Sequence, residues 1–462
     1  MDHYDCAVIG GGLTGLTTAF KLRSLGINAI VIEKQNRIGG QIETHYTKGY
    51  VYESGPNTGA ISHPEVAELF QSISQYCQLE IANPSAKRRL ILKQGVFHPL
   101  PNGIKGGIMT PLFTWRDKFR ILGEPFRKKG SNPNETIGEL TIRRLGKSFL
   151  DYAVDPFISG IYSGDPMKLV TKYALPKLYA LEQTYGSFIK GGIAKAKEKK
   201  CDRDKMATKD VFSVEGGLSN LISSLAQIIG ERHIILNAKD IVIHPEHEKW
   251  QIDFLCKDNT KSLTANHIVT TTAAYQLPKI LPFVDKHLIT PIADLQYASL
   301  MQVSVGLKEN PNPTFKAFGG LIPSIEKENV LGILFPYQCF KNRSPKGKAL
   351  FSIFIGGIKH PDLLLLKDDE VKEIAIDILQ RTMGYDEKYP IEHFAIFRHD
   401  KAIPQYDENT KSRIECISKI EAAYPGLFIA GNLKDGIGMA DRIKQGVSIA
   451  IKIAQTTQKD KG

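Results

Sequence analysis

The sequence predicts an α/β fold in which one domain with a parallel sheet is assembled from three separated segments of the chain. The first observation is that apolar strands, glycine-rich turns and helical patterns occur together near the start, in the middle and at the end of the sequence. The second is that the intervening blocks differ, because residues 98–205 are mainly helical and residues 276–409 are rich in strands. Strands that alternate with helices are typical of a sheet covered by helices.

Residues 6–33 have the pattern of a complete βαβ unit. Apolar strands are expected over residues 6–9 and 29–32, with an amphipathic helix between them, and the second strand leads into Glu33. Three glycines follow the first strand with the spacing of the Rossmann dinucleotide fingerprint: Gly10, Gly12 and Gly15. The strand, helix and acid around the glycines favour ligand binding over a structural turn.

Each residue of this unit has a physical role. Gly10 allows the tight turn, Gly12 lets the backbone approach a pyrophosphate, and Gly15 lets the helix pack closely on the strand. The start of the helix offers unpaired N–H groups to phosphates. Glu33 can accept hydrogen bonds from a ribose, and its charge would repel a 2′-phosphate.

Further glycine-rich turns favour a cofactor longer than NAD. They lie at residues 37–41, at residues 53–57 and at residues 436–439, just before the last helix. Each turn suits a close backbone approach to a ligand, and FAD is long enough to need several. The last turn can direct helix N–H groups at the ribityl or pyrimidine end of a flavin.

Length and composition predict a soluble protein of two or three domains. The chain has 462 residues, 42% hydrophobic and 24% charged, with no apolar run that could span a membrane. Its first residues do not resemble a signal peptide. The six cysteines are scattered, as expected in a reducing cytoplasm, and no metal-ligand pattern is visible.

The positive charge is concentrated in two stretches. Residues 101–130 carry seven Lys or Arg against two acids, and residues 190–205 carry seven against three, which gives +5 and +4 of the total +11. The first stretch interleaves this charge with apolar residues: Ile108, Met109, Leu112, Phe113, Trp115, Phe119, Ile121 and Phe126. This pattern suits a helix at an anionic membrane surface, and also an ordinary amphipathic helix packed on its neighbours.

The remaining elements follow from periodicity and turn residues. Helices are expected over residues 63–80, 218–229, 368–383 and 440–457. Strands are expected over residues 88–92, 95–98, 234–236, 241–243, 250–256, 262–269, 302–307, 318–322, 330–335, 350–355 and 426–430. Residues 195–205 read as a flexible linker, and the segment around His399 reads as a loop.

Several long strings resemble the flavin-dependent protoporphyrinogen and coproporphyrinogen oxidases of haem biosynthesis, within the amine-oxidase-like FAD group. The general group is indicated by the glycine motif, Glu33 and Arg37-x-Gly39-Gly40. The narrower family is indicated by the strings at residues 155–166, 318–323, 331–335, 354–357, 402–406 and 427–432. The resemblance covers nearly the whole chain.

The resemblance implies both cofactor and substrate residues. FAD would be held by Gly10, Gly11, Gly12, Leu13, Thr14, Gly15, Glu33, Lys34, Gly40, Gln41, Gly55, Pro56, Asn57, Thr58, Val242, Ile437, Gly438 and Met439. The porphyrinogen would be bound by Arg89, Gly164, Leu321, Leu334 and Phe354. Arg89 could pair with a propionate through its guanidinium, or it could be an ordinary surface charge. The three apolar side chains could also be simple core.

One position departs from the family. His399 stands where the family commonly has a tryptophan near the flavin, which affects the contacts expected from this segment. The implied reaction removes six electrons from the macrocycle in three FAD cycles, and O₂ reoxidises the flavin to give hydrogen peroxide. Enclosing and orienting the substrate would be the main task of the protein, and no residue is assigned as a general base.

Other readings and partners stay open. An amine oxidase, a carotenoid desaturase or a non-catalytic FAD protein could use the same scaffold. Expected partners are a porphyrinogen, O₂, other haem-pathway enzymes, an anionic membrane surface and a second copy of the chain, but not nucleic acid. The expected domains are an FAD-binding domain (1–60, 206–275 and 410–462), a substrate domain (61–97 and 276–409) and a helical block (98–205).

Overall fold

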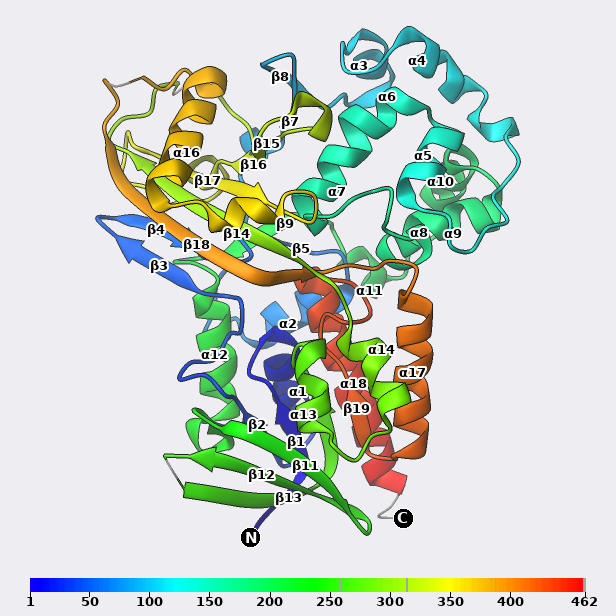
Figure 1. Cartoon of the computed structure of the whole chain (residues 1–462), viewed down its shortest axis with the longest axis vertical. Coiled ribbons are helices and arrows are strands. Elements are labelled where there is room, and N and C mark those ends of the chain that lie inside the picture. The colour runs from blue at the N-terminus through cyan, green and yellow to red at the C-terminus, as the bar shows by residue number, and fades with distance from the viewer. Residues whose placement is uncertain (258, 313–314, 387, 460–462) are drawn as a thin grey trace.

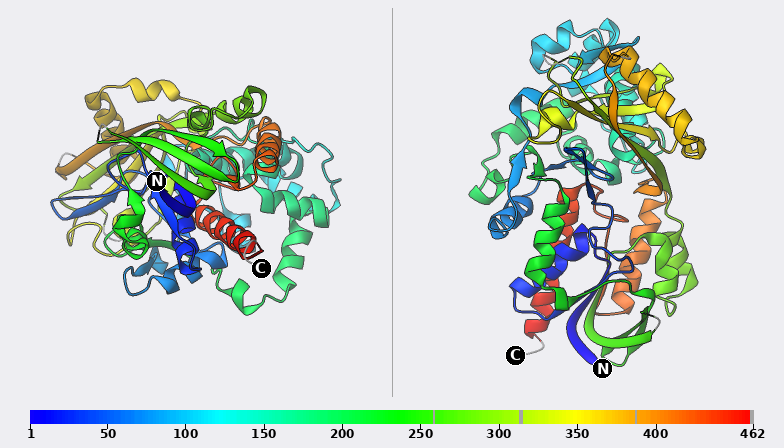
Figure 2. Two further views of the ribbon diagram at one scale, coloured as in Figure 1. Left: turned by 90° about the horizontal axis from the view of Figure 1, so that it is seen from below. Right: turned by 90° about the vertical axis from the view of Figure 1, so that its left-hand side faces the viewer.

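The computed structural model shows an elongated molecule with both termini at one end (Figure 1). It describes residues 1–257, 259–312, 315–386 and 388–459. One half contains the N- and C-terminal segments, and the other contains a second sheet beside a group of helices (Figures 1 and 2). The two halves meet around the glycine-rich turns.

The first sheet joins strands from all three segments expected to share one domain. Its order is β10-β2-β1-β13-β12-β11, and β19 also pairs with β13. The strands are β1 (Asp2–Ile9), β2 (Ala29–Ile32), β10 (Ile234–Ile235), β11 (Lys239–Glu246), β12 (Lys249–Cys256), β13 (Asn259–Thr270) and β19 (Leu427–Ile429). The pairings of β1 with β2 and β13 are parallel. The three-segment sheet is therefore confirmed, while the residue boundaries of the domains stay a prediction.

Both faces of the central strands are buried, which explains their uninterrupted apolar sequences. Along β1, Cys6 and Val8 belong to one core cluster and Ala7 and Ile9 to another. The first cluster includes residues of α1 (Leu13–Ser24), α2 (Pro64–Ser72), α12 (Ser219–Ile229) and α18 (Met439–Lys459). The second includes residues of α13 (Leu277–Ile280), α14 (Lys286–Ala293) and α17 (Thr410–Ala423).

The second sheet has the order β18-β14-β17-β16-β15-β7-β8. Its strands are β7 (Arg89–Lys93), β8 (Val96–Pro99), β14 (Tyr297–Leu307), β15 (Gly319–Leu321), β16 (Val330–Leu334), β17 (Ala349–Gly356) and β18 (Ile391–Pro404). Helix α16 (Asp368–Met383) packs its apolar side chains on one face. Two small sheets lie nearby, one formed by β3 (Thr44–Thr47) and β4 (Tyr50–Glu53), the other by β5 (Gly59–Ala60), β6 (Leu79–Ile81) and β9 (Val211–Val214). A short helix, α15 (Pro336–Cys339), follows β16.

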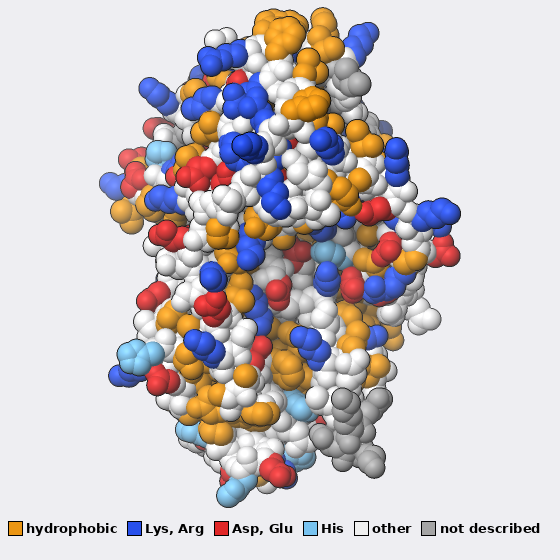
Figure 3. Space-filling model, turned by 90° about the vertical axis from the view of Figure 1, so that its right-hand side faces the viewer, with side chains coloured by type: hydrophobic (Ala, Val, Ile, Leu, Met, Phe, Trp, Pro, Cys, Tyr) orange, Lys and Arg blue, Asp and Glu red, His pale blue; other side chains and the backbone are white. Residues whose placement is uncertain are grey.

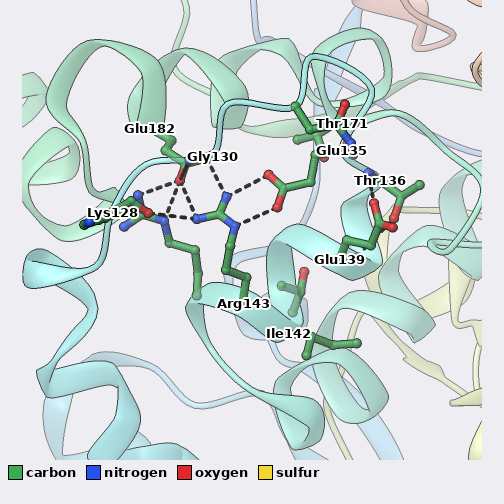
Figure 4. A network of polar contacts seen from close by, with 12 residues as sticks. Lys128, Gly130, Glu135, Thr136, Glu139, Ile142, Arg143, Thr171 and Glu182 are labelled. Atoms are coloured by element: carbon green, nitrogen blue, oxygen red, sulfur yellow. Dashed lines mark hydrogen bonds and ion pairs between the residues drawn. The ribbon is translucent and has the colours of Figure 1, made fainter.

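The predicted helical block is confirmed. It contains α3 (Gly103–Met109), α4 (Trp115–Leu122), α5 (Ile137–Arg144), α6 (Lys147–Phe149), α7 (Asp155–Tyr162), α8 (Thr171–Ala174), α9 (Pro176–Tyr185), α10 (Phe188–Lys197) and α11 (Asp202–Lys205). Arg143 of α5 donates hydrogen bonds to Glu135, which precedes this helix, and to Glu182 of α9 (Figure 4). It therefore links α5 to α9 and to the segment before α5. The neighbouring Arg144 is fully buried and pairs with Glu124 and Glu182.

Three sequence expectations were wrong. The helix expected over residues 63–80 ends at Ser72, and residues 79–81 form β6, which pairs with the distant β9. The expected linker at residues 195–205 contains the end of α10 and all of α11, and Arg203 forms ion pairs with Glu65 and Glu68 of α2. The segment around His399 is not a loop but part of β18, which pairs with β14.

Candidate functional site

A cavity of about 890 Å³ opens where the parallel strands of the first sheet end. Ile9, Ile32, Thr271 and Gly431 line it, and each lies at or just beyond the carboxyl end of β1, β2, β13 or β19. Open α/β sheets bind ligands at this edge. The predicted cofactor residues that line the cavity are Gly10, Gly12, Leu13, Thr14, Glu33, Lys34, Gly40, Gln41, Pro56, Val242, Ile437 and Met439.

The glycine turn has the geometry that the sequence predicts. Gly10 has φ of +110°, which side chains rarely allow. A Cβ on Gly15 would lie 2.0 Å from the carbonyl oxygen of Gly10, so only glycine permits this helix–strand contact. A Cβ on Gly12 would meet no atom within 4 Å, which shows that the backbone borders open space there. Helix α1 begins after Gly12 without a side-chain cap, which suits a phosphate at its start.

Glu33 is fixed at the wall of the cavity. Its carboxylate accepts hydrogen bonds from the backbone N–H of Gly11 at 2.6 Å and of Gln35 at 2.9 Å. The side chain is buried but lines the cavity, so its remaining lone pairs can accept from a ribose. Gly11 does not line the cavity and contributes through this hydrogen bond.

Arg37 holds the loop after Glu33 in place. It belongs to the Arg37-x-Gly39-Gly40 motif but is not among the predicted cofactor residues. Arg37 donates to the carbonyl oxygens of Ile38, Gly40 and Ile42 and pairs with Glu43 at 3.1 Å. These contacts keep the loop beside the glycine turn, where the N–H of Gly39 donates to Gly11 at 2.8 Å. Arg37 itself lines the cavity.

The turns at residues 55–58 and 436–439 border the cavity through Pro56, Ile437 and Met439. A Cβ on Gly55 would lie 2.0 Å from the carbonyl oxygen of Gln41, so any larger residue would clash with the backbone at this position. The N–H of Gly438 donates to Asp441 at 3.2 Å, and Asp441 also contacts His63 at 3.0 Å. Predicted cofactor residues that lie outside the cavity lining are Gly11, Gly15, Gly55, Asn57, Thr58 and Gly438.

The predicted substrate residues Arg89, Leu321, Leu334 and Phe354 share one face of the second sheet. Arg89 pairs with Gly319, which pairs with Leu334, and Leu321 and Phe354 both pair with Gly332. Residues paired directly across strands lie on the same face. The opposite face carries the buried side chains that pack on α16. All three apolar side chains are half-buried rather than core.

Three hydrogen bonds join this face to the loop that borders the cavity. Gln302 donates to the carbonyl oxygen of Glu53 at 2.7 Å, and Ser352 donates to Asn57 at 3.0 Å. The third bond connects Nε2 of His399 with the carbonyl oxygen of Ser54 at 2.7 Å. The face with the four predicted residues is therefore turned toward the half of the molecule that contains the cavity.

The individual positions differ in their surroundings. The exposed Arg89 lies over the ring of Phe318 with its guanidinium carbon 5.6 Å from the ring centre. The side chain of Leu321 packs against Gly160. A Cβ on Gly160 would lie 2.5 Å from a methyl carbon of Leu321. Gly164 is not part of the sheet, and a Cβ there would lie 2.6 Å from Gln405 and 3.0 Å from Leu169.

Two buried titratable groups have strongly shifted pKa values. Burial raises the pKa of Glu53 to about 7, and the hydrogen bonds from Leu218 and Thr44 offset this only in part. Burial and the nearby Lys48 and His45 lower the pKa of His393 to about 4. Neither group lines the large cavity.

Sequence reasoning missed part of the cavity wall. Tyr275, Gln276, Lys279, Tyr297, Lys401 and Arg442 all line it. The ammonium nitrogen of Lys401 lies 4.0 Å from the ring centre of Tyr275, so β18 and the turn at residues 274–276 meet at this wall. No local motif marks these residues, because they come from segments that pair or pack only in the folded chain.

Comparison with known proteins decides the family. The family described as flavin containing amine oxidoreductase matches residues 13–450. The chain belongs to this family. Its cofactor is FAD, and it is an FAD-dependent oxidoreductase. The open space at Gly12 and the cavity volume fit this cofactor. Over the described residues, no cluster of His, Cys, Asp and Glu could hold a metal.

Among curated relatives, protoporphyrinogen oxidase 2 of Arabidopsis thaliana is 29% identical over 96% of this chain and 92% of that protein. Coproporphyrinogen III oxidase of Bacillus subtilis is 24% identical over 95% of each. The crystal structure of an Exiguobacterium protein named "putative protoporphyrinogen oxidase" has a TM-score of 0.81 at 22% identity and covers 98% of this chain and 99% of its own. Cyclohexylamine oxidase of Brevibacterium oxydans has a TM-score of 0.70 at 15% identity, with 98% and 99% covered. The structural likenesses show the fold alone.

Proposed function

We propose that this protein oxidises a porphyrinogen, protoporphyrinogen IX or coproporphyrinogen III, to the porphyrin in haem biosynthesis. The observation that supports this most is the shared sheet face with Arg89, Leu321, Leu334 and Phe354, turned toward the loop that borders the FAD cavity. An apolar face with one guanidinium at its edge suits a flat, hydrophobic macrocycle with carboxylate side chains. The curated relatives that cover nearly the whole chain bear the names of both activities.

Bound FAD would accept hydride equivalents from the macrocycle and pass electrons to O₂, with release of hydrogen peroxide. The residues of the chain have other tasks. Leu321, Leu334 and Phe354 would exclude water and hold the ring, and Arg89 would fix one propionate. Gly12 and the start of α1 would hold the pyrophosphate, and Glu33 the ribose. Aromatisation drives the reaction, so positioning would supply most of the catalysis.

Side-by-side turnover of the two porphyrinogens tests this proposal. The purified protein should be yellow, should consume O₂ with at least one porphyrinogen, and should produce a fluorescent porphyrin together with hydrogen peroxide. Comparing kcat/KM for the two substrates identifies the preferred one. Turnover of amines or polyenes without porphyrin formation would favour the rival activities of this fold and would overturn the proposal.

We also propose a peripheral contact with anionic membranes through α3, α4 and the turn that follows. Met109, Trp115, Phe119, Leu122 and Phe126 are between 60% and 86% exposed. In Figure 3, hydrophobic side chains gather at the top of the molecule beside Lys and Arg side chains. Large exposed apolar side chains flanked by positive charge suit the boundary between headgroups and acyl chains. Leu112 and Phe113 do not contribute, because they are buried core residues.

Liposome flotation tests the membrane contact. The protein should float with anionic vesicles at low salt and less at high salt. The double variant Trp115→Ser/Phe126→Ser should lose most of this binding. Leu365→Ser is the matched control, because Leu365 is 87% exposed but lies in another part of the surface. An equal loss of vesicle binding in both variants would contradict a specific membrane contact through α3 and α4. Across the described chain, no helix is long and apolar enough to cross a membrane.

A further inference from the structure

Arg442 places a buried positive charge at the wall of the FAD cavity. It lies in the first turn of α18, is 8% exposed and lines the cavity. Its Nη1 atom donates to the carbonyl oxygen of Gly431 and to Gln445 at 2.9 Å, and its Nη2 atom donates to the carbonyl oxygen of Lys434 at 2.9 Å. All three partners are neutral oxygens.

No carboxylate in the described part of the chain forms an ion pair with this guanidinium. The nearby acids are engaged elsewhere, since Asp441 contacts His63 and Gly438, and Asp435 accepts from Gln445 at 2.8 Å. The Nε atom of Arg442 is buried without a hydrogen-bond partner. Burial lowers the pKa of Arg442 and outweighs Asp441 and Asp435, which act on the guanidinium only through space. A buried charge without a directly paired counter-charge is costly. Its presence beside a cofactor cavity indicates that the cofactor supplies the opposite charge.

The position of Arg442 relative to α18 indicates which part of FAD this is. Met439 begins the same helix, Ile437 lies two residues before it, and both line the cavity where the flavin ring is expected. The pyrophosphate is expected at a different helix, at Gly12 and the start of α1. Two-electron reduction with uptake of one proton leaves a negative charge on the N1–C2=O side of a flavin. A positive charge close to this atom pair favours the reduced form.

We propose that Arg442 is the counter-charge of the reduced flavin and raises its reduction potential. The residue acts through its charge across the cavity wall and is a positioning residue rather than a catalytic one. Arg442 adds its full charge to the partial positive charge of the α18 start, so that both favour the same reduced form. The proposal concerns the bound flavin alone and does not depend on which substrate is oxidised.

Two substitutions separate the charge of Arg442 from its hydrogen bonds. Arg442→Gln keeps an amide donor but removes the charge, and Arg442→Lys keeps the charge with fewer donors. The readouts are the midpoint potential of the bound flavin, measured by equilibration with dyes in the absence of substrate, and the Kd for FAD. Lys444→Met is the control, because Lys444 is an exposed cation on the same helix and does not line the cavity.

We expect Arg442→Gln to lower the equilibrium constant for two-electron reduction of the bound flavin about tenfold. This corresponds to a midpoint potential that is about 30 mV lower. Arg442→Lys should keep most of the wild-type potential, and Lys444→Met should not change it. Weaker FAD binding with an unchanged potential in the Gln variant would assign the charge to the pyrophosphate and overturn the proposal. An unchanged potential and Kd would show that Arg442 only holds the Gly431–Lys434 turn. If the Gln variant does not fold, a lowered potential in the Lys variant equally contradicts the proposal.

Discussion

Ser352 donates a hydrogen bond of 3.0 Å to Oδ1 of Asn57 and so connects the second sheet to the loop beside the FAD cavity. The amide nitrogen of Asn57 donates to the carbonyl oxygen of Gly55 at 3.0 Å, which fixes the orientation of the amide. Together with the bonds of Gln302 and His399 to the same segment, the contact therefore holds the proposed substrate face against the loop beside the cavity.

Ser352→Ala should disturb substrate orientation while it leaves FAD bound. Loss of one hydrogen bond costs about 1 kcal/mol, which corresponds to about fivefold in kcat/KM. Steady-state kinetics with the preferred porphyrinogen and FAD titration measure the two effects. Ser418→Ala serves as the control, since Ser418 lies exposed on α17 and bonds only within its helix. Unchanged kinetics in Ser352→Ala would show that the contact is not needed.

Arg89→Ala should raise KM more than it lowers kcat, because the proposed contact with a propionate exists before and during the reaction. Arg88→Ala is a matched control, since Arg88 is the preceding residue and is also exposed. Parallel kinetics of both variants test this expectation. Equal effects of the two substitutions would indicate a general charge effect rather than a specific contact.

Arg144→Met should destabilise the helical block strongly. The substitution leaves Glu124 buried without its ion-pair partner, and breaking a buried pair costs about 3–5 kcal/mol. Urea unfolding combined with limited proteolysis should show an earlier transition and faster cleavage within residues 98–205. Arg143→Met should have a smaller effect, because Arg143 is part-exposed. If Arg144→Met had no greater effect than Arg143→Met, the buried pair would not stabilise the block.

Glu53 should make stability depend on pH. Its pKa is about 7 in the folded chain, above the ordinary value of 4.5, so the folded state binds the proton more tightly than the unfolded state. The stability that this group contributes is therefore full below about pH 4.5 and is lost as the pH rises through about 7.

The free energy of unfolding measured between pH 5 and 8 should fall less in Glu53→Gln than in the wild type. His393 changes stability in the opposite direction, because its lowered pKa removes stability as the pH falls from about 6.5 toward 4. Both proteins contain His393, so the difference between their curves isolates Glu53. Parallel curves would show that Glu53 does not titrate in this range.

The sequence was sufficient where local pattern determines structure. The βαβ unit was predicted because its apolar runs, glycines and acid lie within residues 6–33, and α16 was predicted with its observed ends, Asp368–Met383. Strand β18 was missed, because Arg398, Asp400 and Lys401 give it no apolar alternation, and it is a strand through its pairing with β14.

The missed part of the site has the same cause. Lys401 and Arg442 read as an ordinary loop residue and an ordinary helix residue, and their positions at the cavity follow from contacts between distant segments. Conversely, the shared face of Arg89, Leu321, Leu334 and Phe354 was not derivable from spacing, because it depends on the register of four strands. Family resemblance supplied what periodicity could not.

The pairing of β1 with β13 and the packing of α1 on α18 have a consequence for protein synthesis. The first strand leaves the ribosome early, but its partner follows more than 250 residues later, and α18 is made later still. Such distant contacts slow folding and leave strand edges unpaired in the meantime. The nascent N-terminal unit therefore waits with an apolar strand exposed, so chaperone binding during translation should concentrate on the first 33 residues.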